Sequence, residues 1–111
     1  MMEEKPRVTG STTIAPEVIE TIIKMTAMET KGVSDIPLSP SHQAVKLRVD
    51  GKVVNAEIYL RIRHHFNVIE VGKKVQENIN RVIRETIDME PGIINIHVVD
   101  IDFVASSADK A

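Results

Sequence analysis

Residues 44–66 alternate regularly between apolar and polar positions. Val45, Leu47 and Val49 are separated by charged residues, which is the period of a strand with one buried face. A second alternating run follows Asp50-Gly51, and its apolar members are Val54, Ala56, Ile58, Leu60 and Ile62. Asp-Gly suits a two-residue hairpin turn, because both central positions need a positive φ, which glycine and aspartate tolerate. The pattern predicts a hairpin with one face toward the core.

The other face of this hairpin is polar and mostly basic. Its members are Lys46, Arg48, Asn55, Glu57, Tyr59, Arg61, Arg63 and, past the strand, His65. Because side chains alternate across a strand, these residues point away from the core when Val54 to Ile62 point toward it. We therefore expect a rigid, solvent-facing surface that carries a single tyrosine.

Two segments show the periodicity of amphipathic helices. The first begins at Pro16, where the missing N–H of proline costs nothing, and Gly32 is expected to end it as a left-handed cap. The second begins at Asn67, which forms a capping box with Glu70, and Pro91-Gly92 is expected to stop it. Its apolar stripe is Val68, Val71, Val75, Ile79, Val82, Ile83 and Ile87.

The remaining segments complete a fold prediction. Residues 8–15 favour a short strand, residues 34–43 contain two prolines and three serines and favour a loop, and residues 93–103 form a final strand. Two amphipathic helices need one apolar surface, which a sheet supplies. The prediction is an α+β two-layer sandwich, with both helices on one face of a three- to four-stranded mixed sheet around the Asp-Gly hairpin. A parallel crossover through the second helix is compatible with this order.

Length and composition fit one soluble domain. The 111 residues are 42% hydrophobic and 27% charged, which is ordinary globular composition. We expect the domain over residues 8–104 and flexible tails at 1–7 and 105–111. No apolar run approaches the ~20 residues of a membrane span, and the first seven residues lack the apolar stretch of a signal peptide. A cytoplasmic protein is expected, with peripheral attachment to the membrane left open.

Candidate chemistry is sparse. The chain has no cysteine, so disulfides and thiolate ligands are excluded. His64 and His65 are adjacent, so in a strand they would point to opposite faces, and no carboxylate has a spacing that would complete a metal site with His65 and His97. Asp100 and Asp102 share a strand face, but at a terminal strand such residues more often discourage edge pairing than form a catalytic pair. We expect no enzyme, no cofactor and no metal.

The final strand carries apolar residues on both of its faces. One set is Ile94, Ile96 and Val98, and the other is Val99, Ile101 and Phe103. One strand cannot bury both sets against the same helices. Either a β-bulge near Val99-Asp100 shifts the alternation, or the second set forms an exposed stripe that contacts another chain.

The basic strand face also permits a second function, the binding of single-stranded RNA, in which aromatic rings stack on bases and arginines hold phosphates. Several features weigh against it. There is one tyrosine, Glu57 interrupts the patch, and the formal net charge is −2, whereas nucleic-acid binders usually carry a positive field. Nucleic acid is therefore the alternative partner rather than the expected one.

Three stretches resemble the alkaline shock protein family of bacterial envelope stress response proteins, best known in Gram-positive bacteria. They are residues 10–22 with 31–33, residues 51–54, and residues 71 and 75–79 with the closing run 94–103. The resemblance implies a non-enzymatic protein that self-associates and works in the cytoplasm near the membrane. It supplies no catalytic residues.

The residues and the resemblance together predict an adaptor or self-assembling scaffold in envelope stress and envelope homeostasis. We expect a homo-oligomer with protein partners, among which a small membrane anchor protein would explain peripheral association at the inner face of the membrane. The predicted partner-binding residues are Tyr59, Arg61, Arg63, Val99, Ile101 and Phe103.

Overall fold

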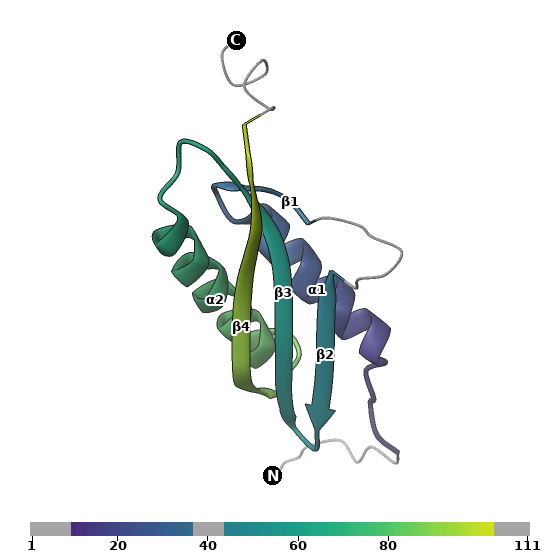
Figure 1. Cartoon of the computed structure of the whole chain (residues 1–111). Coiled ribbons are helices and arrows are strands. Elements are labelled where there is room, and N and C mark those ends of the chain that lie inside the picture. The colour runs from purple at the N-terminus through teal and green to yellow at the C-terminus, as the bar shows by residue number, and fades with distance from the viewer. Residues whose placement is uncertain (1–9, 37–43, 104–111) are drawn as a thin grey trace.

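The computed structural model describes residues 10–36 and 44–103. In chain order the elements are α1 (Pro16–Glu29), β1 (Val33–Asp35), β2 (Val45–Asp50), β3 (Val53–Arg63), α2 (Val68–Glu85) and β4 (Glu90–Asp102) (Figure 1). The tails predicted at 1–7 and 105–111 lie outside the described residues.

β3 is the centre of a mixed, four-stranded sheet. β4 runs parallel to β3 along one edge, from the pair Val53–Glu90 to the pair Arg63–Asp102. Both antiparallel partners therefore share the other edge of β3. There, β2 pairs with the first half of β3, and β1 pairs with its end, where Val33 lies opposite Ile62.

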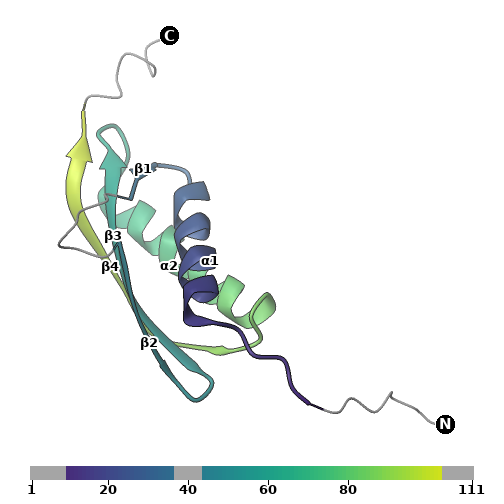
Figure 2. The same cartoon turned by 90° about the vertical axis from the view of Figure 1, so that its right-hand side faces the viewer.

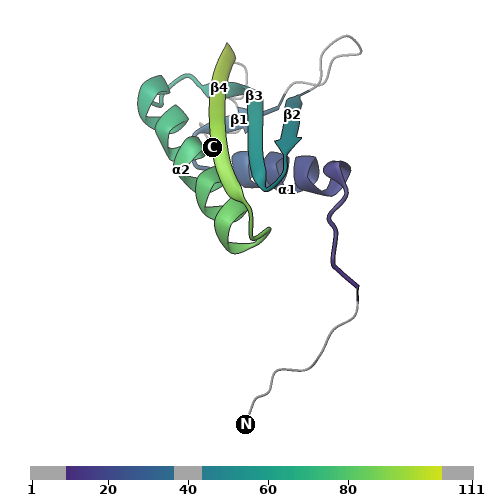
Figure 3. The same cartoon turned by 90° about the horizontal axis from the view of Figure 1, so that it is seen from below.

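Both helices cover the same face of this sheet, as predicted. α1 packs against β2, β1 and α2, whereas α2 packs mainly against β4. Figure 2 shows the sheet edge-on with the two helices in one layer beside it, and Figure 3 shows the same arrangement from below. Among the described residues no element covers the opposite face. We call this the open face.

The core lies between the two layers and is aliphatic. The core face of β3 is made of Val54, Ala56, Ile58, Leu60 and Ile62, each at most 3% exposed. α1 contributes Ile19, Ile23 and Ala27, and α2 contributes Val71, Val75, Ile79 and Ile83. A fully buried aliphatic side chain contributes about 1.5–3 kcal/mol, so this alternation fixes which face of β3 points outward.

The position of the hairpin turn and the end of the second helix differ from their predictions. Asp50 is the last residue of β2 and pairs with Val53, so the connection consists of Gly51 and Lys52 rather than Asp50 and Gly51. Gly51 has a φ of 59°, and glycine with positive φ at the first central position is typical of a type II′ turn. α2 ends at Glu85, so the predicted stop at Pro91-Gly92 is wrong: both residues belong to β4.

The first third of the chain also differs from its prediction. Residues 10–15 form no strand, and residues 8 and 9 lie outside the described part. Instead, a short β1 occupies the start of the predicted loop, because its backbone pairs with the end of β3. α1 ends at Glu29 with Thr30 as its cap, so Gly32, with a φ of 100°, serves the turn into β1 rather than the helix end.

The start of α2 is confirmed. The Oδ1 atom of Asn67 accepts a hydrogen bond of 3.0 Å from the backbone N–H of Glu70. This bond satisfies one of the backbone donors that a helix leaves open at its first turn.

Candidate interaction surface

The open face displays a row of polar side chains along β3, with contributions from the strands on both sides. Asn55, Glu57, Tyr59, Arg61 and Arg63 are all partly exposed, in alternation with the buried residues of the same strand. The structure thus places the predicted residues Tyr59, Arg61 and Arg63 on the solvent side. Two side-chain clusters organise this row.

The first cluster surrounds Tyr59. Its ring stacks on His97 of β4, with centroids 4.7 Å apart and an interplanar angle of 14°. The Nζ atom of Lys46, from β2, lies 5.7 Å from the ring centroid. Because β2 and β4 flank β3 on opposite edges, these two contacts reach the tyrosine from opposite sides.

A carboxylate fixes the same cluster. Oε1 of Glu57 accepts a hydrogen bond of 3.2 Å from the Tyr59 hydroxyl and lies 3.1 Å from Nε2 of His97. Tyr59 of β3 and His97 of β4 therefore share one oxygen of Glu57. The arrangement holds the ring of Tyr59 in one orientation.

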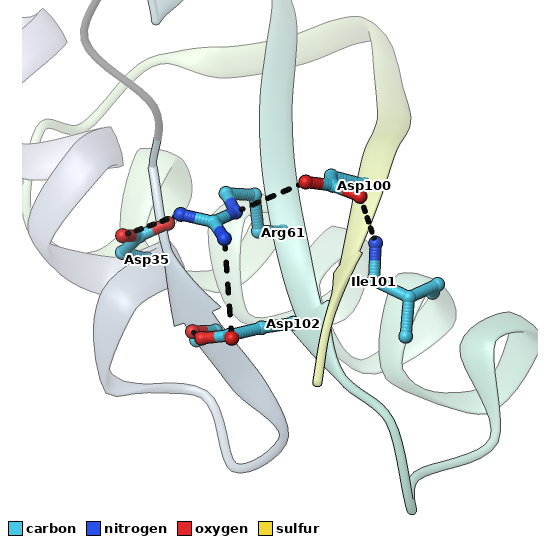
Figure 4. A network of polar contacts seen from close by, with 6 residues as sticks. Asp35, Arg61, Asp100, Ile101 and Asp102 are labelled. Carbon is cyan, nitrogen blue, oxygen red and sulfur yellow. Dashed lines mark hydrogen bonds and ion pairs between the residues drawn. The ribbon is translucent and has the colours of Figure 1, made fainter. Parts of the chain in front are cut away.

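The second cluster surrounds Arg61, which is the centre of a three-carboxylate network (Figure 4). Its guanidinium nitrogens lie 3.4 Å from an oxygen of Asp35, 3.6 Å from Asp100 and 3.9 Å from Asp102. Asp35 belongs to β1, whereas Asp100 and Asp102 belong to β4. Ser34 donates a hydrogen bond to Asp102. The guanidinium thus connects the three strands at this end of the sheet.

Two β-bulges bring these acids to Arg61. In β1 the register shifts between Val33 and Asp35, so that Asp35 lies opposite Arg61. In β4 the register shifts after Val98, so that Asp100 also lies opposite Arg61. Each bulge inserts one unpaired residue and redirects the side chains beyond it. The network therefore depends on how β1 and β4 pair with β3, and not on the spacing of residues within one strand.

The bulge in β4 explains why this strand carries apolar residues on both of its faces, for which the sequence allowed either a bulge or an exposed stripe. Val99 is the inserted residue and is 52% exposed. Beyond it, Ile101 lies opposite Ile62 and packs against the core. Phe103 is 63% exposed, and its ring stacks on His64 with centroids 5.4 Å apart. The three predicted contact residues therefore do not form one continuous stripe.

The histidines occupy separate places. His64 and His65 lie in the turn after β3 rather than in the strand, and their rings contact each other at 5.1 Å. His97 lies opposite Tyr59. In the part of the chain that the structure describes, no group of three or more histidine, aspartate or glutamate side chains is arranged to hold a metal ion.

Sequence reasoning missed the partners of these clusters. Lys46 and Glu57 were placed on the polar face without a link to the Tyr59 ring. His97 was considered only as a metal ligand, and Asp35 was assigned to a loop. The pairing of Lys46 with Glu57 follows from the hairpin register, which the alternation could have supplied. No feature of the sequence could have placed Asp35 beside Arg61, because a three-residue strand carries too little pattern.

The fold and this surface define a small α+β domain with an ordered polar sheet face. The chain belongs to the alkaline shock protein 23 family, described as having a cell envelope-related function, and the family model matches residues 4–103. This match confirms the resemblance inferred from the sequence. A similar protein is YqhY of Bacillus subtilis (strain 168), described as uncharacterized, which is 28% identical over an alignment of 106 positions; the match covers 85% of this chain and 78% of the relative.

Solved structures of the MamM CTD share the fold. A variant of that domain superimposes with a TM-score of 0.62 at 16% identity, covering 79% of this chain and 100% of the other. A nickel form gives a TM-score of 0.60 at 17% identity, covering 78% and 99%. At this level of identity the likeness concerns the fold alone. Of the helices that the structure describes, neither combines the length and the apolar character needed to cross a membrane.

Proposed function

We propose that this protein is a non-enzymatic adaptor or self-assembling scaffold, which acts through protein–protein contacts in envelope homeostasis and the envelope stress response. The observation that carries the proposal is the open face: one whole side of the sheet is uncovered by any described element, yet its side chains are ordered by contacts between strands. Membership of a family with a cell envelope-related function supports the envelope part of the proposal.

The order of this face suits recognition. The Arg61 network connects β1, β3 and β4. The Tyr59 cluster connects β2, β3 and β4. Side chains that are already fixed lose little conformational entropy when a partner binds. A surface of this kind therefore binds more tightly than a mobile one of equal area.

The proposed contact surface combines Tyr59, Arg61, Arg63, Val99, Ile101 and Phe103. Val99 and Phe103, which are exposed at the end of β4, supply most of its apolar area, whereas Ile101 is partly buried. Aromatic and arginine side chains are the residue types that dominate binding energy at interfaces. We propose a homo-oligomer in the cytoplasm that also contacts protein partners. A small membrane anchor protein would hold it at the inner face of the membrane.

Two features of the open face count against RNA. Base stacking needs a free aromatic face, whereas the ring of Tyr59 is flanked by His97 and Lys46. Phosphate binding needs available cations, and Arg61 is not available, because it lies within 4.0 Å of three carboxylates. Protein contacts therefore fit this face better than nucleic acid does.

The test compares Phe103→Ala with Ile69→Ala, which removes an equally exposed apolar side chain from α2: the two are 63% and 67% exposed. Light scattering after size-exclusion chromatography measures self-association, and affinity capture from the native bacterium measures partner recovery. Truncating an anchor at an interface costs ~2 kcal/mol, so Phe103→Ala should weaken association by roughly 30-fold, whereas Ile69→Ala should leave it unchanged.

Equal behaviour of the two variants would contradict the proposed surface. Tight binding of single-stranded RNA at low salt, weakening steeply as salt is added, would favour the alternative function, since phosphate contacts are strongest at low salt.

A further inference from the structure

A second part of the open face lies between the hairpin end of β2 and the start of β4. There the surface forms a shallow concavity of about 230 Å³. It is lined chiefly by Lys46, Arg48, Asn55, Glu57, Ile93 and Asn95. None of these residues takes part in the Arg61 network.

A β-bulge shapes this concavity. Val54 and Ala56 of β3 lie opposite Pro91 and Ile94 of β4, so β4 contains one residue more than β3 between these pairs. Oδ1 of Asn55 fills the gap and accepts a hydrogen bond of 2.8 Å from the backbone N–H of Ile93. Bulges redirect side chains and are enriched beside functional sites.

Gly92 is fitted to this bulge. A Cβ atom at that position would lie 2.3 Å from Oδ1 of Asn55 and 2.7 Å from a methyl group of Val53. The close approach of the Asn55 amide to β4 therefore requires a glycine. The next residue, Ile93, is 65% exposed and lines the concavity.

The charges around the concavity are unbalanced. Arg48 makes no ion pair or hydrogen bond with any residue in the described ranges 10–36 and 44–103, and Lys46 contacts only the ring of Tyr59 there. The acidic member of the lining, Glu57, is already engaged by Tyr59 and His97. Oδ1 of Asn55 is occupied as well, which leaves its amide N–H groups to donate. Two cations and one fixed amide therefore face a site whose single acidic lining residue, Glu57, is already in contact with Tyr59 and His97.

We propose that this concavity binds an acidic peptide segment of a partner protein, with a carboxylate placed between Lys46 and Arg48 and a neighbouring apolar side chain against Ile93. The inference rests on the proposed function in that the partner is a protein. Hydrogen bonds from cations to carboxylates are stronger than those between neutral groups. The volume lies below the ~300–1,000 Å³ of pockets that enclose whole small molecules, so it suits one or two side chains of a longer segment.

The test is an amide-detected NMR titration of the full-length protein with two capped tetrapeptides, Glu-Leu-Glu-Leu and its uncharged counterpart Gln-Leu-Gln-Leu. The acidic peptide should shift the backbone amides of Arg48, Asn55 and Asn95, whereas the uncharged one should not. Arg48→Gln should weaken binding by about tenfold, the range expected for one hydrogen bond to a charged group. Arg84→Gln, on the outer side of α2, is the matched control and should bind as the wild type does.

A second variant, Asn55→Asp, separates binding from folding. The new side chain keeps an oxygen that accepts from Ile93, so the bulge and the melting temperature should be preserved. It also places a negative charge directly opposite Arg48, so affinity for the acidic peptide should fall at least as far as in Arg48→Gln. An unchanged affinity in both variants would overturn the proposal.

Three further outcomes would also overturn it: equal shifts by both peptides, shifts confined to the helical face, or tighter binding of an eight-residue oligouridylate than of the acidic peptide. The last would assign the concavity to nucleic acid. If Phe103→Ala abolishes self-association while the acidic peptide fails to bind, the adaptor function stands and this site alone is wrong.

Discussion

Replacement of Arg61 by methionine tests how much the ion pairs between β1, β3 and β4 contribute to the stability of the fold. Methionine keeps the length of the side chain but removes the charge that three carboxylates share at 3.4–3.9 Å. Asp35 and Asp100 are 45% and 61% exposed, and ion pairs of such exposure are each worth about 0.5 kcal/mol. The side chain of Asp102 is only 10% exposed, so its interaction with Arg61 should contribute about 1–2 kcal/mol.

The sum predicts that Arg61→Met lowers the free energy of unfolding by about 2–3 kcal/mol. For a domain of this size such a loss lowers the melting temperature by roughly 10–20 °C. Urea unfolding followed by circular dichroism measures it directly.

The control is Lys74→Met, which removes an exposed pair with Glu77 on α2 at 4.0 Å and should cost at most about 0.5 kcal/mol. Asp100→Asn in the Arg61→Met background should recover part of the loss, because it removes one of the repelling charges. A variant Arg61→Met as stable as the wild type would refute this interpretation of the network.

Three further stability predictions follow from local geometry. Gly32→Ala should cost about 2–4 kcal/mol, because Gly32 has a φ of 100° and a Cβ atom there would lie 2.7 Å from a methyl carbon of Val71; a smaller change than 1 kcal/mol in thermal unfolding would contradict it. Gly72→Ala is the matched opposite case: nothing lies within 4 Å of its added Cβ, so helix propensity should raise stability by about 0.5–1 kcal/mol, and a loss would show that the space is not open. Asn67→Ala removes the cap of α2 and should cost about 1 kcal/mol in the same assay, with Asn67→Ser as the variant that should restore it.

Much of the fold could be predicted because long periodic segments carry it. The alternation from Val54 to Ile62 identified the buried face of β3, and the Asn67 cap and the apolar stripe after it identified α2. Since two helices had one apolar sheet face available, their placement on the same side followed. The parity conflict in β4 had two explanations, a bulge or an exposed stripe, and the register shift after Val98 shows the bulge.

The parts that the sequence did not predict depend on contacts between distant segments. β1 is three residues long and exists because it pairs with β3, so local propensity could not reveal it. The hairpin turn is centred on Gly51, which has a positive φ, and Thr30 rather than a glycine caps α1. The Arg61 network joins residues 26 and more positions apart, and two bulges set its register. Sequence alternation predicts which face a residue occupies, but not its neighbour across a bulge.

The most direct test of the central claim, that the open face is where this protein meets its partners, is photo-crosslinking in living cells. A photoreactive phenylalanine analogue replaces Tyr59 on the open face and, in a separate strain, Lys74 on the outer side of α2. Discrete protein adducts are expected from position 59 and none above background from position 74. Adducts confined to position 74, with none from position 59, would contradict it.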